Sequence, residues 1–163
     1  MTRQKRIYFT RAVYHVCIRG NNRQYVLQEK EDKIAFLESL SKFKERFGFK
    51  LYAIVLMDNH PHLIIEPAGH ITISKIMQAV ALSYSFKFRK KYHYTGYVWQ
   101  GRFKSNVISG DEYILSAIEY IHNNPVRANI TARPEDYLWS SYHFYHGRTD
   151  PLKDYIALDG FKG

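Results

Sequence analysis

Hydrophobic and polar positions follow a pattern that predicts six elements, in the order strand, helix, strand, strand, helix, strand. Apolar side chains recur at the helical spacing over Glu31–Phe47 and from Ile71 to about Lys91, so we expect amphipathic helices there. Gly48 follows the first helix, where a helix end favours glycine. The expected strands are residues 12–18, 51–56 and 63–65 and a fourth segment that ends at Ile108. This order is typical of the split βαβ, or ferredoxin-like, α+β sandwich, with an antiparallel sheet and helices on one face.

A third helix is expected after the fourth strand, as an extra C-terminal helix that carries a tyrosine outside its apolar stripe. Ser109 and Glu112 have the Ser-x-x-Glu spacing of a capping box, and Pro125 cannot continue a helix, so the helix should begin at this box and end near Asn124. Its apolar stripe consists of Ile114, Leu115, Ile118 and Ile121. Tyr120 lies off that stripe, four residues before Asn124, so both side chains can address one point. A tyrosine so placed is most often a surface residue and does not by itself indicate a nucleophile.

A histidine pair, His60 and His62, lies at the start of the third expected strand. Residues two apart in a strand point to the same face, so the two imidazoles should stand side by side and form half of a divalent-metal site. Two exposed strand histidines are the more common outcome for such a pair. Pro61 between them donates no ladder hydrogen bond, which is unfavourable in a central strand. Glu66 shares their strand face, and we expect it to be exposed rather than a ligand.

Charge and aromatic content narrow the class of partner. The formal net charge is +9, the sequence pI is about 9.6, and the chain contains 14 Tyr and 10 Phe. Cationic side chains pair with phosphates and aromatic rings stack on bases, so this composition favours single-stranded nucleic acid, although a basic surface alone gives the same charge. Trp99 and Phe103, beside Arg102 and Lys104, form either such a stacking patch or the core of a hairpin.

Length and cysteine content bound the architecture. The 163 residues fit one domain with its own core. Cys17 is the single cysteine, so we expect neither a disulfide framework nor a cysteine-based zinc site. No run of eighteen apolar residues occurs, which predicts a cytoplasmic, nucleoid-associated protein without a membrane partner.

The histidine pair, the off-stripe tyrosine and the ferredoxin-like order together resemble the single-tyrosine HUH transposases. Within that superfamily the chain is most similar to the REP-associated tyrosine transposases, which are related to the IS200/IS605 transposases. The similar runs follow the family order across roughly residues 7 to 145, nearly the whole chain. They are Arg19-Gly20-Asn21-Asn22-Arg23-Gln24, Val55 to Leu63, Trp99 to Ser105, Asp111-Glu112-Tyr113, Tyr120 to Ala128 and Trp139-Ser140-Ser141-Tyr142.

This resemblance implies a role for each matching residue. His60 and His62 fall on the metal ligands, Tyr120 on the catalytic tyrosine, and Asn124 on the place of a glutamine that completes the metal site. The implied activity is cleavage and transfer of single-stranded DNA through a 5′-phosphotyrosine, on hairpin-forming, REP-like repeats. The implied cofactor is Mg²⁺ or Mn²⁺, and two imidazoles with an amide oxygen suit Mn²⁺ somewhat better, with zinc as a third candidate. Candidate DNA contacts are Arg3, Lys5, Arg6, Arg19, Arg23, Arg102, Lys104 and Arg127.

Two other functions stay open at this stage. A non-catalytic DNA-binding module of the same fold is favoured if Pro61, which replaces the larger hydrophobe usual in the family, displaces His62. A metal-dependent hydrolase would use His60 and His62 to activate water.

We expect the transposase domain at residues 1–128, with an aromatic-rich appendage at 129–163 packed on it. The protein should be a monomer with a cis site or a homodimer with a trans site, and the short connection from Ile108 to Asp111 favours cis slightly.

Overall fold

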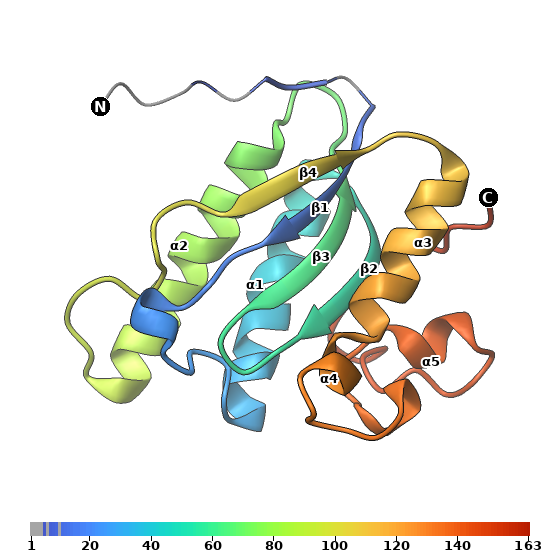
Figure 1. Ribbon diagram of the computed structural model, residues 1–163. Coiled ribbons are helices and arrows are strands. Elements are labelled where there is room, and N and C mark those ends of the chain that lie inside the picture. The colour runs from blue at the N-terminus through green and yellow to red at the C-terminus, as the bar shows by residue number, and fades with distance from the viewer. Residues whose placement is uncertain (1–4, 6, 10) are drawn as a thin grey trace.

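The computed structural model describes residues 5, 7–9 and 11–163 and shows a four-stranded sheet with helices on both sides (Figure 1). The strands lie in the order β2-β3-β1-β4, and each neighbouring pair is antiparallel. They are β1 (Val13–Cys17), β2 (Lys50–Leu56), β3 (Pro61–Glu66) and β4 (Lys104–Ile108). The α+β class and the ferredoxin-like order expected from the sequence are therefore confirmed.

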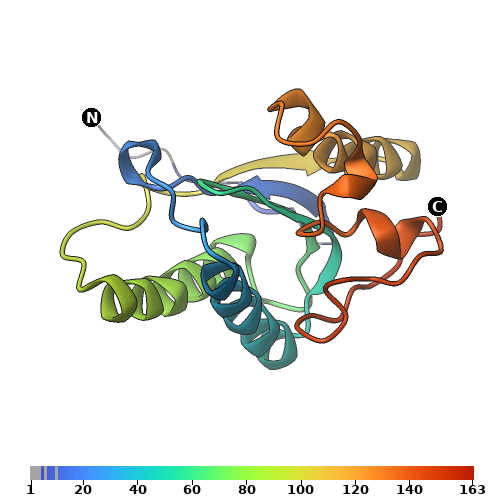
Figure 2. The ribbon, with the colours of Figure 1, turned by 90° about the horizontal axis from the view of Figure 1, so that it is seen from below.

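Two long helices, α1 (Lys30–Phe47) and α2 (Ile73–Tyr92), cover one face of the sheet (Figure 2). α1 ends at Gly48, whose φ of +68° lies in the left-handed region that glycine enters without steric cost. α2 begins after Thr72, whose Oγ1 accepts a hydrogen bond from the backbone N–H of Lys75 at 3.2 Å. The larger core fills the space between these helices and the sheet. No helix in the described part of the chain combines the length and apolar character needed to cross a membrane.

α3 (Asp111–His122) lies on the opposite face and carries Tyr120 (Figures 1 and 2). Ile114, Ile118 and Ile121 are buried against the sheet, as the stripe predicts. Leu115 is 41% exposed, so its assignment to the stripe is wrong. A smaller second core therefore forms between α3 and the sheet, and it covers only part of this face.

Both ends of α3 differ from the expectation. Gly110, with a φ of +100°, occupies the N-cap and no side chain caps the helix, so the capping box at Ser109 is wrong. The chain turns at Gly110, which only glycine allows comfortably, and Ser109 is thereby moved out of the capping position. At the other end, Pro125 lies in the first turn of a new helix, α4 (Asn124–Arg127), where its missing N–H is not needed. Tyr120 and Asn124 therefore belong to consecutive helices.

The C-terminal segment packs along the outer edge of β2. The backbone N–H of Leu56 donates to the Trp139 carbonyl, and that of Ser141 donates to the Ile54 carbonyl, both at 2.9 Å. This pairing covers an edge that would otherwise expose unpaired backbone groups. Leu152 is fully buried in the core under α1 and α2. The remaining short helices are η1 (Asn21–Arg23), η2 (Pro134–Asp136) and α5 (Tyr142–Tyr145).

Pro61 occupies a position in β3 that tolerates proline. It is the first residue of the strand and stands opposite Leu56 of β2. On the other side, the ladder with β1 begins one residue later, where His62 stands opposite Cys17. A proline at the first residue of a strand removes no interior ladder bond. The unfavourable effect that the sequence suggested for Pro61 is therefore avoided.

Candidate active site

Strand alternation sends neighbouring side chains of β1 and β3 to different faces of the sheet. Val16 of β1 and Leu63 of β3 are fully buried in the core under α1 and α2. Cys17, which follows Val16, and His62, which precedes Leu63, point to the opposite face, on the α3 side. Because Cys17 and His62 are direct cross-strand partners, their side chains lie next to each other on that face.

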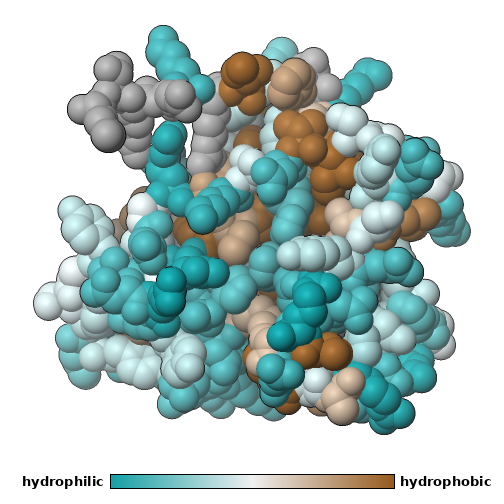
Figure 3. Space-filling model, viewed as in Figure 1, coloured by the Kyte–Doolittle hydropathy of each residue, from teal (hydrophilic) through white to brown (hydrophobic). Residues whose placement is uncertain are grey.

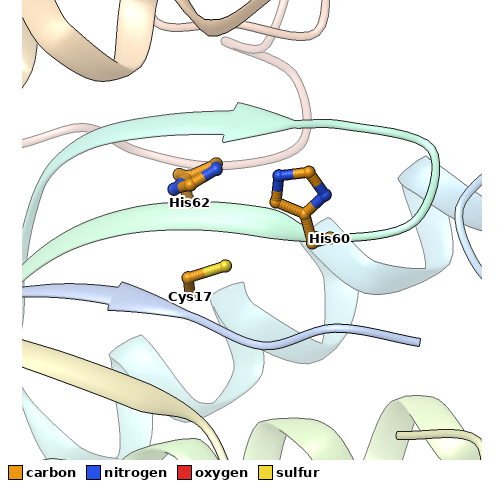
Figure 4. A group of neighbouring side chains, drawn as sticks. All are labelled: Cys17, His60 and His62. Carbon is orange, nitrogen blue, oxygen red and sulfur yellow. The ribbon is translucent and has the colours of Figure 1, made fainter. Parts of the chain in front are cut away.

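Cys17, His60 and His62 form a compact group on this face (Figure 4). One ligand atom from each of the three residues lies within 4.8 Å of the other two. The ring centroids of His60 and His62 are 4.7 Å apart, and the sulfur of Cys17 is directed toward the space between the two rings. All three side chains are half-buried. The side-by-side histidine pair predicted from the strand pattern is present.

Outer contacts fix the orientation of both imidazoles. Nδ1 of His62 and Nε2 of His15 share a hydrogen bond of 3.0 Å, and Nδ1 of His60 is bonded to Oδ1 of Asn59. These contacts leave Nε2 of each ring as the nitrogen without a hydrogen bond to the described residues. Such an arrangement is typical of metal-binding histidines, whose second nitrogen is held by a neighbouring group.

Burial keeps both imidazoles neutral near pH 7. It lowers the pKa of His60 to about 4, with a further contribution from the positive charge of Arg19. It lowers the pKa of His62 to about 3, helped by the neighbouring histidines and then by Arg127 and Arg19. A neutral imidazole offers the lone pair that a metal ion requires. Burial raises the pKa of the Cys17 thiol, while Arg19 and Lys104 act in the opposite direction.

Tyr120 borders the histidine group from α3. Its ring centroid is 6.3 Å from that of His15, and the tyrosine is 55% exposed. The guanidinium of Arg127 lies over the Tyr120 ring, with its Cζ 3.9 Å from the centroid. Arg127 also donates to the carbonyl of Tyr120 and to Oδ1 of Asn124. The Asn124 Nδ2 is buried and has no hydrogen-bond partner among the described residues.

Three loops meet at the end of the sheet that holds His60. The backbone N–H of Gly20 donates to the Asn59 carbonyl at 2.8 Å, and that of Gln100 donates to the Arg19 carbonyl at 2.8 Å. A Cβ on Gly20 would lie 2.4 Å from the Gln24 carbonyl oxygen, so no larger residue fits there. Three of the family-like runs, far apart in sequence, are therefore packed together around the histidines.

The candidate DNA contacts that the structure describes are all exposed: Lys5, Arg19, Arg23, Arg102, Lys104 and Arg127. Arg3 and Arg6 lie outside the described residues. The face of the molecule shown in Figure 3 carries α3 and is largely hydrophilic, with hydrophobic side chains gathered mainly over the end of β4. This polar surface beside the histidine group is suited to contact with a charged backbone.

The structure decides one open alternative and corrects one expectation. Trp99 and Phe103 are each only 8% exposed, and the Trp99 Nε1–H donates to the Ala81 carbonyl at 3.1 Å, so they belong to the core rather than to a stacking patch. Glu66 is half-buried and accepts a hydrogen bond from the Tyr52 hydroxyl, so the expectation of an exposed carboxylate is wrong. It lies at the end of β3 opposite to the histidine pair.

His15 and Cys17 belong to the site but were not recognised from the sequence. The expectation of no cysteine-based zinc site stays a prediction, although Cys17 lies beside both histidines. A signal for both residues was present in the sequence. They are two apart in a strand, and the ferredoxin-like order places that strand next to the one with the histidine pair.

Comparison with known proteins agrees with the fold and gives the family. A curated protein of Haemophilus influenzae, named as a REP-associated tyrosine transposase, is 26% identical over 110 residues, which cover 61% of this chain and 62% of that protein. The fold is similar to that of a REP-associated tyrosine transposase solved with a REP hairpin, at a TM-score of 0.76, 19% identity and coverage of 100% and 95% of the two chains. A Deinococcus radiodurans protein assigned as a transposase matches with a TM-score of 0.51 and 17% identity, over 75% of this chain and 97% of that one. The family model for IS200-like transposases matches residues 8–124, and the chain belongs to that family.

Proposed function

We propose that this protein cleaves and rejoins single-stranded DNA with Tyr120 as the nucleophile and a divalent metal ion at His60 and His62. The observation that carries the proposal is the position of the Tyr120 ring beside His15, which in turn is hydrogen-bonded to His62. Tyr120 on α3 thus lies beside the histidine group formed by His62 on β3 and by His60, just before that strand.

In the proposed reaction, Tyr120 Oη forms a bond to the phosphorus of a phosphodiester. The bond from phosphorus to the 3′ oxygen breaks, and the proton lost by the phenol is balanced by the proton gained by the departing 3′-OH. The 5′-phosphotyrosine stores the energy of the original bond, so a second 3′-OH can reverse the step on another strand without ATP. Arg127, which lies over the Tyr120 ring, is placed to offset the negative charge that develops on the phosphate.

Members of this family generally use a divalent metal, and the donor set fits one. The two Nε2 atoms of His60 and His62 supply neutral ligands, and the bound ion would polarise the phosphoryl oxygens. We assign Asn124 as the third ligand for Mg²⁺ or Mn²⁺. Its Oδ1 accepts from Arg127, which is placed to exchange Asn124 for the DNA phosphate and so free this oxygen for coordination. That exchange couples arrival of the substrate to completion of the site.

The proposed substrate is a hairpin-forming repeat with a single-stranded flank. One support is the similar fold of the transposase that was solved with a REP hairpin. Another is the set of exposed basic side chains on the loops around the histidine group. We assign phosphate contacts to Arg3, Lys5, Arg6, Arg19, Arg23, Arg102, Lys104 and Arg127, which give affinity and register rather than sequence specificity.

We further assign the active site to one chain, with Tyr120 acting in cis. The ring of Tyr120 reaches the histidine group of its own chain, with His15 between them. No exchange of α3 with a second copy is needed to bring these residues together.

The test is a cleavage assay on single-stranded DNA that contains a hairpin-forming, REP-like repeat, with Mn²⁺ or Mg²⁺, followed by a denaturing protein gel. Wild type should give a metal-dependent DNA–protein adduct, and Tyr120→Phe and His62→Ala should not. Tyr113→Phe is a matched control, because Tyr113 is also on α3 and is 61% exposed. A hairpin gel shift without an adduct would identify a binding module instead. Turnover by Tyr120→Phe would indicate a hydrolase that activates water.

A further inference from the structure

Cys17 stands opposite His62 in the β1–β3 ladder, and its sulfur is directed toward the two imidazoles (Figure 4). Among the residues that the structure describes, this is the one group of three or more histidine, cysteine or carboxylate side chains with metal-binding spacing, and it contains no carboxylate. We propose that Cys17, His60 and His62 form a three-ligand site for a thiolate-preferring divalent ion, with Zn²⁺ as the expected occupant. The site shares its histidines with the proposed function and, in that respect, rests on it.

The donor set selects the class of ion. One sulfur and two imidazole nitrogens suit Zn²⁺, Co²⁺ and Cd²⁺, whereas Mg²⁺ prefers oxygen ligands throughout. Three protein ligands leave the fourth tetrahedral position open for water or a phosphate oxygen, as in catalytic rather than structural zinc sites. The Asn124 amide would not be required for such an ion.

The geometry is close to that needed for coordination. A tetrahedral zinc ion holds one sulfur and two nitrogen ligands roughly 3.3 to 3.5 Å apart, given Zn–S of about 2.3 Å and Zn–N of about 2.0 Å. The three ligand atoms already lie within 4.8 Å of one another, so side-chain rotations that move these atoms by about 1 Å would bring them to coordination distance. His15 and Asn59 hold the opposite nitrogens of the two rings and limit their rotation.

The charge balance also favours a sulfur ligand. Arg19, Lys104 and Arg127 act electrostatically on this group of residues, so a dication held by neutral ligands alone adds to an already positive region. Coordination releases the thiol proton of Cys17 to solvent, and the resulting thiolate offsets one of the two charges of the ion. Zn²⁺ and Mn²⁺ therefore compete for the same histidines, and Cys17 favours Zn²⁺.

The experiment is a Co²⁺ titration of the full-length, metal-free protein, followed by absorption spectroscopy and then displacement by Zn²⁺. A thiolate-to-Co²⁺ charge-transfer band should appear, and it reports on Cys17 alone because the chain has no other cysteine. Cys17→Ser should abolish this band and weaken Zn²⁺ binding by about 100-fold or more, since loss of even an outer contact to a metal ligand costs about 10–100-fold. Circular dichroism should show that Cys17→Ser keeps the fold.

Control variants separate this proposal from the proposed function. Tyr120→Phe should keep the charge-transfer band while losing the DNA adduct, whereas His62→Ala should lose both. The proposal is overturned if wild type shows no charge-transfer band, or if Cys17→Ser binds Zn²⁺ as tightly as wild type. Either result leaves the covalent tyrosine chemistry unaffected, because the adduct assay with Mn²⁺ measures it independently.

Discussion

The two faces of the sheet are built from alternate residues of the same strands, but their environments are different. On the face under α1 and α2, Val16 and Leu63 are fully buried among apolar side chains. On the opposite face, Cys17 (next to Val16) and His62 (next to Leu63) are half-buried and face polar neighbours beside α3. Stability and chemistry are therefore separated by a single step along a strand. Substitution of a buried apolar residue under α1 and α2 should mainly change stability, and substitution within the histidine group should mainly change the chemistry.

A second contrast, between two histidines, shows that a low pKa alone does not identify a functional residue. Burial lowers the pKa of both His62 and His122 to about 3. His122 bonds to the Ser141 hydroxyl at 2.7 Å, and Ser141 Oγ accepts from the Ile54 N–H, so His122 joins α3 to the C-terminal segment where Ser141 contacts β2. His62 instead has one nitrogen without a hydrogen bond to the described residues, and it lies beside Cys17 and His60. The neighbours, rather than the pKa, distinguish the metal-binding candidate from the structural residue.

Leu63→Ala and His62→Ala, at adjacent positions, test the difference between the faces most strongly. Leu63→Ala removes a fully buried side chain and should lower the free energy of unfolding by about 2–5 kcal/mol, with adduct formation per folded molecule preserved. His62→Ala should lower it by only about 1 kcal/mol. The same variant should reduce adduct formation by more than about 100-fold. Denaturant unfolding and the adduct gel measure the two effects, and a similar stability loss in both variants would contradict the separation.

Arg127→Ala should slow adduct formation by roughly 100-fold, because it removes both the charge facing the phosphate and the group that covers the Tyr120 ring. Arg127→Lys should restore only part of the rate, since an ammonium supplies the charge but not the planar stacking. Single-turnover cleavage measures the rate. Arg148→Ala is the control, because it removes one exposed positive charge on the C-terminal segment. If Arg148→Ala slows cleavage as much, the effect is one of overall charge.

Acid titration should reveal the structural histidine. His122 has a native pKa of about 3, well below its ordinary value near 6.5. Between these two pH values the unfolded chain binds a proton at His122 and the native state does not. Stability should fall as the pH decreases from about 6.5 toward 3, by at most about 1.4 kcal/mol per pH unit from this residue. His122→Gln cannot titrate and should flatten the dependence, measured by urea unfolding across that range. An unchanged slope would assign the acid sensitivity to other groups, with His60→Gln as the next variant to examine.

The smallest effect is expected from a single phosphate contact. Lys104→Ala should flatten the slope of log K against log salt by about 0.7 to 0.9, as expected for the loss of one phosphate contact. Fluorescence anisotropy of a labelled hairpin at several salt concentrations measures the slope. Lys153→Ala, an exposed lysine on the C-terminal segment, should leave the slope unchanged. A slope equal to that of wild type would remove Lys104 from the DNA interface.

The sequence alone determined the order of the elements and the faces of its strands. Hydrophobic periodicity located α1 and α2 and the strand with the histidine pair, because these patterns are local consequences of helix and strand geometry. It also separated Tyr120 from the buried stripe of α3. The family-like runs then agreed with the match to IS200-like transposases over residues 8–124.

Only the tertiary structure decided which side chains meet. Cys17 and His15 join the histidine pair because β1 pairs with β3 across more than forty residues of sequence, a contact that local periodicity does not encode. Arg127 reaches Tyr120 because α4 follows directly after α3, with Pro125 in its first turn. Trp99 is buried because its indole fits against α2, which composition cannot specify. Short-range geometry thus fixed the faces, and long-range packing fixed the site.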